Sequence, residues 1–523
     1  MFKNSRRQMA LLLVLAMVLT SLAGWQSGTV DAAKKAAFSS KKITLTVGRS
    51  KKLTVKNAKG KKLTWKIKNK KIAKMTKSGK YGKKVKALKK GSTTITCKVK
   101  AGKKSYTLKC KVKVNAKKKA TPAPAVTPAP VVPTTAPTVT PTATPYPPMT
   151  PIKEAYANVI PVVGNCLSLN QLKDEKLLAA FKTHFNSFTL ENEMKPEAIL
   201  KNDTLVNTSE AKTMTGTYVV PDSYEESTVP HLNFETIDQV LKIAYDNGIK
   251  MRAHTLVWHS QTPEWFFRTG YQGSGKVVST TVMDARMEMY IKSVMYHVYQ
   301  LDDGKYKDTV YAWDVVNEYM HNGSGNWSSV YGSRSVLGTK PGYVKTAFQI
   351  ADSVLQDLGI RDKVSFIFND FNTYVDPQSE TDIINFINEG EETKICNGIG
   401  MQSHLDVDYP SPEEFIAAVD IFKANNFEIQ ITEFDATINN KEGRYNFERQ
   451  KEADQGVYVD ALMKAIVAAK RGGANITGFT IWGMYDTISW RKESKPLLFK
   501  SYDATTGALT PKISFYNFIN AAK

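Results

Sequence analysis

The chain has 523 residues, which at ~150 residues per domain is enough for more than one domain. Its formal net charge of +23 is unevenly placed: residues 34–120 hold 33 Lys and Arg and no Asp or Glu, whereas residues 121–523 hold 36 basic and 48 acidic residues. The sequence therefore predicts a basic module joined to an acidic body, and the average charge does not by itself indicate nucleic-acid binding.

Residues 1–33 have the pattern of a secretory signal peptide. Three basic residues precede an apolar stretch, Ala10 to Ala23, which is shorter than the ~20 residues that a membrane span needs. Small residues follow, and cleavage is expected after Ala23 or Ala32. An uncleaved membrane anchor is the alternative. We expect a secreted protein, with association at the cell surface as a second expectation.

Residues 34–115 contain short runs in which apolar and polar side chains alternate, which is typical of a small antiparallel β-sandwich. The predicted strands are Ile43–Val47, Leu53–Val55, Leu63–Ile67, Ile95–Val99 and Tyr106–Val114, the last two joined as a hairpin across residues 101–104. Cys97 and Cys110 fall on the inward face, either bridged or packed. The chain has no Cys-x-x-Cys, so a thiolate zinc site is not expected.

Several runs in this region, among them Ile-Thr-Leu-Thr-Val-Gly and Leu-Thr-Trp-Lys, resemble the bacterial immunoglobulin-like domain of group 2. Lysines occupy most outward positions, and base-stacking aromatic residues are few, so nucleic acid is not the expected partner. For an exported protein we expect acidic cell-wall polymers or acidic polysaccharide. The alternative is a plain spacer that its charge keeps soluble. Residues 116–151, which hold eleven of the 22 prolines, are predicted to be a semi-rigid linker.

From residue 152 to 523, apolar strand-like runs alternate with amphipathic helices. The strand candidates are Val159–Asn165, Phe185–Thr189, Lys250–Val257, Val310–Val316, Val364–Phe368, Gly398–Met401, Glu428–Thr432 and Ile476–Ile481. The helix candidates are Phe234–Asn247, Met283–Gln300, Gly342–Leu358, Ser379–Glu389, Pro412–Ala424 and Arg449–Arg471. This order predicts an α/β fold, a (β/α)8 barrel. A doubly wound open sheet is the alternative, but no Gly-rich phosphate loop follows the first strand.

Two of these strands end on a glutamate. Trp313-Asp314-Val315-Val316-Asn317-Glu318 closes the fourth, and Ile429 to Asp435 carries Glu433 at the end of the seventh. A barrel presents its chemistry at the carboxyl ends of its strands, and two carboxyl groups are the minimum set for cutting a glycosidic bond. Polar residues also follow the second, third, fifth, sixth and eighth strands, which is hard to obtain by chance.

The motifs Glu-Asn-Glu-Met-Lys, His-Thr-Leu-Val-Trp-His-Ser-Gln, Trp-Asp-Val-Val-Asn-Glu, Asn-Asp-Phe-Asn and Ile-Thr-Glu-Phe-Asp, in this order, resemble glycoside hydrolase family 10. Its known members are mainly retaining endo-1,4-β-xylanases. The resemblance implies that Glu318 is the acid/base and Glu433 the nucleophile, with His404 orienting Glu433 and Asn317 near the sugar 2-hydroxyl. It implies that the sugars are held or walled by Glu191, Asn192, Lys195, His254, Trp258, Gln402, Trp482 and Trp490.

The implied substrate is xylan or arabinoxylan, with no cofactor and no metal, and a monomer is expected. Retention predicts carboxyl groups about 5–5.5 Å apart, whereas inversion would separate them by roughly 6.5–9.5 Å. Another β-1,4-glycanase, such as a cellulase, is the close alternative. A surface-binding protein with a degenerate barrel is the alternative from another class.

Other residues have structural interpretations. Trp313 is expected to pack in the barrel, and Asp314 to hydrogen-bond rather than act as a third acid. His254 and His259 should face opposite sides of a strand, which disfavours a zinc pair. The sequence departs from the family pattern in a long connection, Asn202 to His231, expected at the glycone end of the cleft. It departs also in Tyr319 and Phe434.

Overall fold

The structure is a computed structural model that describes two ranges of the chain. These are residues 36–115, except 41, 48–49, 60, 78–80 and 102–103, and residues 148–523, except 324, 408 and 439–451. The predicted signal peptide and all but the end of the predicted linker lie outside them. The chain divides into two compact units, Met1–Thr142 and Ala143–Lys523, which are described separately.

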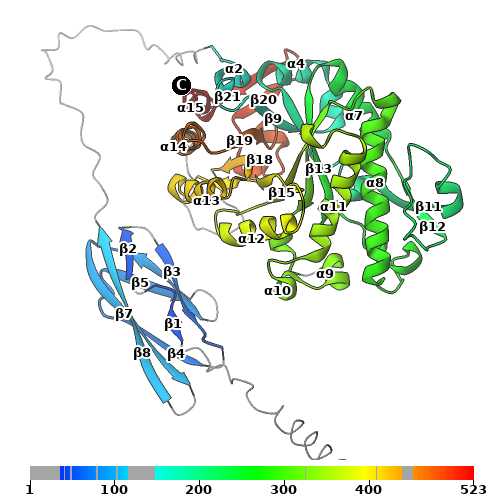
Figure 1. The fold of residues 1–523 in the computed structure, drawn as a ribbon. Coiled ribbons are helices and arrows are strands. Elements are labelled where there is room, and N and C mark those ends of the chain that lie inside the picture. The colour runs from blue at the N-terminus through cyan, green and yellow to red at the C-terminus, as the bar shows by residue number, and fades with distance from the viewer. Residues whose placement is uncertain are drawn as a thin grey trace, which may run out of the picture. The chain divides into compact units, whose positions relative to one another are not determined.

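The first unit is a sandwich of two four-stranded sheets (Figure 1). One sheet has the order β1-β3-β6-β5 and the other β2-β8-β7-β4. The strands are β1 Ala37–Phe38, β2 Lys42–Thr46, β3 Ser50–Lys56, β4 Lys62–Ile67, β5 Ala73–Lys77, β6 Gly82–Ala87, β7 Gly91–Ala101 and β8 Lys104–Asn115. The sandwich is therefore confirmed, and β1, β5 and β6 are strands that the sequence analysis missed.

One expectation for this unit is wrong: the sandwich is not wholly antiparallel. β2 pairs with β8 in parallel, with Ile43 opposite Val112, because the chain leaves the first sheet after β1 and joins the second at its edge. The core is built from the inward side chains, including Leu53, Val85 and Ile95. Cys97 and Cys110 are buried in it as free thiols.

In the second unit as described, eight parallel strands close into a barrel, and helices surround it (Figure 1). The order around the barrel is β9-β10-β13-β14-β15-β16-β18-β19, and β19 pairs with β9 to close it. The strands are β9 Val162–Leu167, β10 Ser187–Leu190, β13 Lys250–Trp258, β14 Val310–Asn317, β15 Ser365–Asp370, β16 Gly398–Met401, β18 Glu428–Thr437 and β19 Ile476–Ile481.

The (β/α)8 prediction is confirmed, with every predicted strand present: β16 and β19 have the predicted bounds, and the other six differ by one to five residues at one or both ends. β9 begins three residues later than expected, and β18 continues five residues further. β18 is buried at all ten positions, as a parallel strand covered on both faces should be. It runs on because the short strand β17, His404–Asp406, pairs with its end and sets His404 opposite Asp435.

The helices between the barrel strands cover the barrel with an apolar face. In α7, for example, Ile237, Val240, Leu241 and Ala244 are buried at the spacing of one helix face. The longer helices are α4 Glu175–His184, α7 Glu235–Asp246, α8 Thr280–Gly304, α11 Gly342–Asp357, α12 Pro377–Asn388, α13 Pro412–Ala424, α14 Glu452–Arg471 and α15 Ile513–Asn520. Regular helical backbone in α8 ends before Leu301, as predicted.

The long connection after β10 forms an antiparallel hairpin of β11, Leu200–Asn207, and β12, Thr228–Leu232. It packs on α8, where Glu226 pairs with the buried Arg286. A smaller hairpin, β20 Phe499–Asp503 and β21 Ala508–Pro511, follows the last barrel strand. Among the described residues, no helix has the length and apolar character to cross a membrane.

Candidate active site

A cleft of about 420 Å³ lies where the barrel strands end. It is lined by residues from the ends of many strands, and all twelve residues predicted for the site are among them. These are Glu191, Asn192, Lys195, His254, Trp258, Asn317, Glu318, Gln402, His404, Glu433, Trp482 and Trp490. Strand ends that are hundreds of residues apart in sequence therefore meet in one place.

Glu318 directly follows β14 and turns the chain there. Its backbone is left-handed, with φ of 59°, and its N–H donates to Asn369 O at 2.8 Å. Trp258 Nε1 donates to Glu318 Oε2 at 2.9 Å, and Gln402 Nε2 donates to Oε1 at 2.9 Å. Both donors are uncharged. His259 Nε2 lies 3.8 Å from Oε2, so His259 approaches the site from beyond the end of β13.

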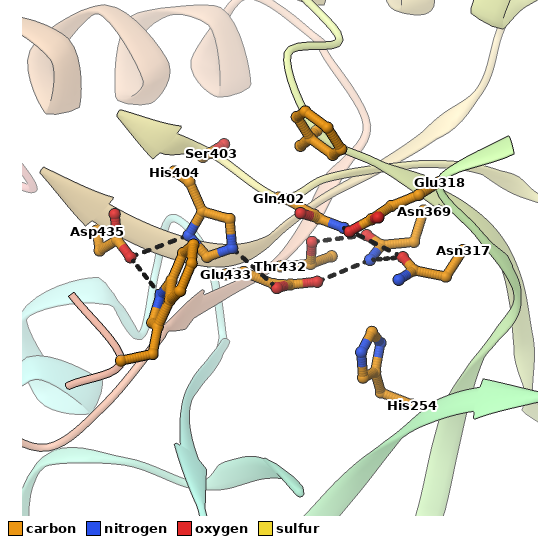
Figure 2. A network of polar contacts seen from close by, with 12 residues as sticks. His254, Asn317, Glu318, Asn369, Gln402, Ser403, His404, Thr432, Glu433 and Asp435 are labelled. Carbon is orange, nitrogen blue, oxygen red and sulfur yellow. Dashed lines mark hydrogen bonds and ion pairs between the residues drawn. The ribbon is translucent and has the colours of Figure 1, made fainter. Parts of the chain in front are cut away.

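Glu433 lies within β18 and is 4% exposed. His404 Nε2 lies 3.1 Å from Glu433 Oε2, and Asn369 Nδ2 donates to Oε1 at 2.9 Å (Figure 2). Burial alone would raise the pKa of Glu433, but the hydrogen bond with His404 and the nearby charges of His254, His404 and Lys195 lower it to about 2. This carboxyl group is therefore held in its ionised form at neutral pH.

His404 lies between Glu433 and Asp435, and Figure 2 shows its ring reaching both carboxylates. Its Nδ1 is 2.9 Å from Asp435 Oδ2, and Asp435 also accepts from Trp490 Nε1 at 3.1 Å and from Arg491 at 2.7 Å. Burial lowers the pKa of His404, but Asp435 and Glu433 raise it to about 9. His404 is thus a largely enclosed cation between two anions, and it contacts Glu433 directly.

An amide network joins the two glutamates. Gln402 Nε2, which donates to Glu318, also donates to Asn317 Oδ1 at 3.1 Å. Asn369 Nδ2 donates to the same Asn317 oxygen and to Glu433, both at 2.9 Å (Figure 2). Thr432 Oγ1 donates to Asn369 Oδ1 at 2.7 Å and fixes the direction of that amide.

Gly400 in β16 makes room for this network. A Cβ at position 400 would lie 2.2 Å from Asn369 Oδ1, which is closer than a side chain tolerates. The glycine therefore allows Asn369 to reach across toward Glu433 and Asn317. Asn369 was not among the predicted site residues, although it stands in the Asn-Asp-Phe-Asn motif.

A second buried network lies beside the first. Asp314 forms an ion pair with Arg252, and its Oδ2 is 2.8 Å from His254 Nδ1. All three side chains are at most 2% exposed. Asp314 is therefore a structural partner that orients His254, as expected. Trp313 is fully buried and donates to Tyr299 Oη at 2.8 Å, so it packs in the barrel, also as expected.

Another wall of the cleft is formed by the residues after β10. Lys195 donates to Asn192 Oδ1 at 3.2 Å, and its Nζ lies 4.9 Å from the centre of the Trp258 ring. Burial lowers the pKa of Lys195 and raises that of Glu191, against the opposing effect of each on the other. These groups offer a cation, a carboxyl and an amide to sugar hydroxyls.

The cleft also contains four residues that were not predicted as site residues: Gln261, Phe371, Asn372 and Arg491. Each stands in or next to a strand-end motif, so extending the motifs to every polar neighbour would have found three of them.

No residue of 202–231 lines this cleft. Tyr319 is buried and donates to Gly338 O, and Phe434 packs on Phe479, so these departures lie in the core and not in the cleft. Among the described residues, no cluster of His, Cys, Asp and Glu is arranged to hold a metal ion.

Comparison with known proteins identifies two domains in the chain. Residues 151–513 match the profile of glycosyl hydrolase family 10, and residues 32–110 match the bacterial Ig-like domain of group 2. The chain belongs to glycosyl hydrolase family 10. It is a glycoside hydrolase with an N-terminal Ig-like domain.

Among its relatives is endo-1,4-beta-xylanase A of Butyrivibrio fibrisolvens, 41% identical over 69% of this chain and 84% of the relative. The bifunctional endo-1,4-beta-xylanase XylA of Ruminococcus flavefaciens is 33% identical, over 61% of this chain and 30% of its own length. A crystal structure of the xylanase 10B CBM22-1–GH10 modules of Clostridium thermocellum with xylohexaose has 27% identity and a TM-score of 0.54. It covers 73% of this chain and 69% of that one.

Proposed function

We propose that this family 10 enzyme is a secreted endo-1,4-β-xylanase that retains anomeric configuration, with Glu318 as acid/base and Glu433 as nucleophile. The observation that carries the proposal is the contrast between the two carboxyl groups of one cleft. The hydrogen bond with His404 and the nearby charges lower the pKa of Glu433 to about 2, whereas the hydrogen-bond donors to Glu318 are the uncharged side chains of Trp258 and Gln402. The similarity to proteins described as endo-1,4-β-xylanases supports xylan as the substrate.

In the first step Glu433 Oε attacks the anomeric carbon of the sugar that precedes the scissile bond. The bond from that carbon to the glycosidic oxygen breaks, and Glu318 gives its proton to the leaving oxygen. A covalent glycosyl-enzyme remains. In the second step Glu318, now ionised, takes a proton from water, the water oxygen attacks the same carbon, and Glu433 leaves as a carboxylate. Two inversions give net retention.

The surrounding side chains have supporting roles in this scheme. His404 keeps Glu433 ionised, and His404 and Asn369 together orient it, since each contacts one of its oxygens. Asn317 Oδ1 receives two amide hydrogen bonds, which leaves its own NH₂ free to point at a sugar hydroxyl. Trp482 and Trp490 offer ring faces to the apolar faces of the sugars.

The test is sugar release from xylan and from a soluble cellulose by wild type and Glu433→Ala, with and without azide. We expect wild type to cut xylan, and Glu433→Ala to lose about four orders of magnitude of activity. Azide should restore turnover of activated xylosides to a glycosyl azide of inverted configuration. Near-normal activity of Glu433→Ala contradicts both role assignments. A wild-type preference for cellulose leaves the mechanism intact and contradicts the choice of xylan.

We also propose that the protein is exported, on the basis of the signal-like pattern of residues 1–33. The expected result is enzyme in the culture medium or on the cell surface whose N-terminus begins shortly after Ala23 or Ala32. Enzyme that stays inside the cell with an intact N-terminus contradicts this. The expectation of a monomer stays a prediction.

A further inference from the structure

The sheet β2-β8-β7-β4 of the Ig-like domain has an outer face of unusual composition. Among the described residues, every side chain that alternation turns outward on these strands is Lys, Ser or Thr. The lysines are Lys42, Lys62, Lys66, Lys98, Lys100, Lys109, Lys111 and Lys113, and the hydroxyl residues are Thr64, Ser92, Thr94, Thr96, Ser105 and Thr107. We call this set the lysine–hydroxyl face.

The register of the strands arranges these lysines in rows. Lys62 lies opposite Lys100, Lys98 opposite Thr107, and Lys109 opposite Thr96. Lys111 and Lys113 follow in the next two rows, opposite Thr94 and Ser92. Successive rows are two residues apart, or ~6.8 Å along the strands. Five consecutive rows therefore each present at least one ammonium group, over a track of ~27 Å.

This arrangement is unfavourable for the domain alone. Like charges directly opposite one another repel, and Lys62–Lys100 on β4 and β7 and Lys42–Lys111 on β2 and β8 are such pairs. Residues 34–120 contain no Asp or Glu that could offset them. A bound polyanion would remove this repulsion, and its gain would be larger than on a surface of mixed charge.

We propose that the lysine–hydroxyl face binds an extended polysaccharide that carries carboxylate groups, as uronic acids do. A linear chain along the strands would meet a cation in every row, and the Ser and Thr hydroxyls would hydrogen-bond sugar hydroxyls. The face has no aromatic side chain among its described residues, so it offers no stacking platform for unpaired bases. The choice of a polysaccharide rests on the proposed function of the catalytic unit, since a tethered module that binds the same class of polymer raises the local concentration of substrate.

The test measures binding of the full-length chain to polygalacturonate, a linear polyuronate. Fully methyl-esterified polygalacturonate has the same backbone without the charge. We expect binding to the free acid to be at least about tenfold tighter, and to weaken about tenfold between ~50 and ~500 mM NaCl. Equal binding to both polymers overturns the recognition of charge that the proposal states, and binding to neither polymer overturns the proposal and leaves a spacer. Tighter binding to duplex DNA or polyphosphate than to the uronate also overturns it.

Two matched variants localise the binding. Lys109→Gln/Lys111→Gln/Lys113→Gln removes three charges from β8, one of the two inner strands of the face. Lys56→Gln/Lys74→Gln/Lys86→Gln removes three exposed charges from the other sheet. We expect the affinity for polygalacturonate to fall about tenfold in the β8 variant and at most about threefold in the variant of the other sheet. Exposed charges that lie more than a Debye length from the bound polymer are screened. Equal losses contradict a specific face.

Two further measurements separate the causes of failure. The triple Lys→Arg variant at positions 109, 111 and 113 keeps the charge and should bind like wild type, and a loss here contradicts an electrostatic face. Hydrolysis of short neutral xylo-oligosaccharides is followed in the same wild-type preparation. Binding without hydrolysis contradicts the proposed function alone, and hydrolysis without binding contradicts the lysine–hydroxyl face alone.

Discussion

Glu318 and Glu433 are the same side chain at the ends of two strands of one barrel, yet their surroundings differ in kind. The contacts of Glu433 include a cation, His404, which Asp435 keeps charged. The hydrogen-bond donors to Glu318 are an indole and an amide, which carry no charge. A carboxylate beside fixed cations stays ionised, which suits a nucleophile, and Glu433 alone of the two has this surrounding.

The different roles of the two glutamates are therefore set by the residues that contact them, since the two side chains are chemically identical. The two carboxyl groups share one amide network, through Asn317, Gln402 and Asn369, which ties their positions together. The charged residues Asp435 and Arg491 lie on the side of Glu433 and stand outside this amide network. A substitution can therefore change the charge near Glu433 without breaking the network that positions the two carboxyl groups.

After Glu433→Ala, removal of the Glu318 carboxyl group should give the largest effect. Glu318→Ala loses the proton donor, and we expect kcat/KM on xylan to fall about 10³-fold or more. An aryl xyloside with a good leaving group needs no proton in the first step, so its glycosyl-enzyme should still form and accumulate. Azide should then yield a glycosyl azide of retained configuration, opposite to the Glu433→Ala product. Identical azide products from both variants contradict the assigned roles.

Asp314 tests the buried support beside the cleft. Asp314→Asn leaves Arg252 without a counter-charge in a site that is 1% exposed, and breaking such a pair costs about 3–5 kcal/mol. We expect the melting temperature of the catalytic unit to fall by roughly 5 °C or more. Six of the eight tryptophans lie in that unit, so tryptophan fluorescence reports on it. Asp460→Asn, which breaks an exposed pair with Lys464, is the control and should leave the melting temperature unchanged. An equal shift in both variants contradicts the structural role of Asp314.

His404 tests the charge around Glu433 directly. His404→Gln keeps a hydrogen-bond donor but removes the cation, so the pKa of Glu433 should rise from about 2 toward its ordinary range. Glu433 must be ionised to attack, hence the acid limb of kcat/KM should move to higher pH. We expect about a 10- to 100-fold loss at neutral pH.

The control for His404 is a histidine that contacts a carboxylate away from the cleft. His297 bridges Asp238 and Gly216 O, so His297→Gln makes the same substitution without touching the cleft. Its pH profile should match wild type. If His404→Gln lowers activity with no movement of the acid limb, then His404 acts by packing and not by charge.

Much of this arrangement was predictable from the sequence because parallel strands carry their own signal. The run Phe366-Ile367-Phe368, for example, is apolar on both faces, and the polar residues Asn369 and Asp370 follow it where the strand ends. All twelve predicted site residues were therefore found in one cleft. The ends of the strands were predicted less well. β18, for example, is extended by its pairing with β17, and no local sequence pattern indicates that pairing.

The sequence does not indicate which residues contact one another across the barrel. Asn369 and Arg491 stand in strand-end motifs, but their importance comes from partners 64 and 56 residues away, Glu433 and Asp435. In the Ig-like domain the parallel pairing of β2 was missed for a related reason. Alternation in Lys42–Thr46 predicts a strand, and the choice of its neighbour depends on where the chain crosses between sheets.

Trp490 should give the smallest effect and gives the finest test of the contrast between the two glutamates. Its ring lines the cleft, and its Nε1 donates to Asp435 at 3.1 Å. Trp490→Phe keeps a ring for the sugar but removes one of the donors to Asp435, worth about 0.5–1.5 kcal/mol. We expect kcat/KM on xylan to fall about two- to tenfold, with the acid limb in place, because Arg491 and His404 still contact Asp435. Trp490→Ala removes the ring as well and should raise KM further. If instead Trp490→Phe shifts the acid limb as far as His404→Gln does, then the charge on His404 depends on the indole, and the cation beside Glu433 is maintained by a longer chain of contacts than Asp435 and Arg491 alone.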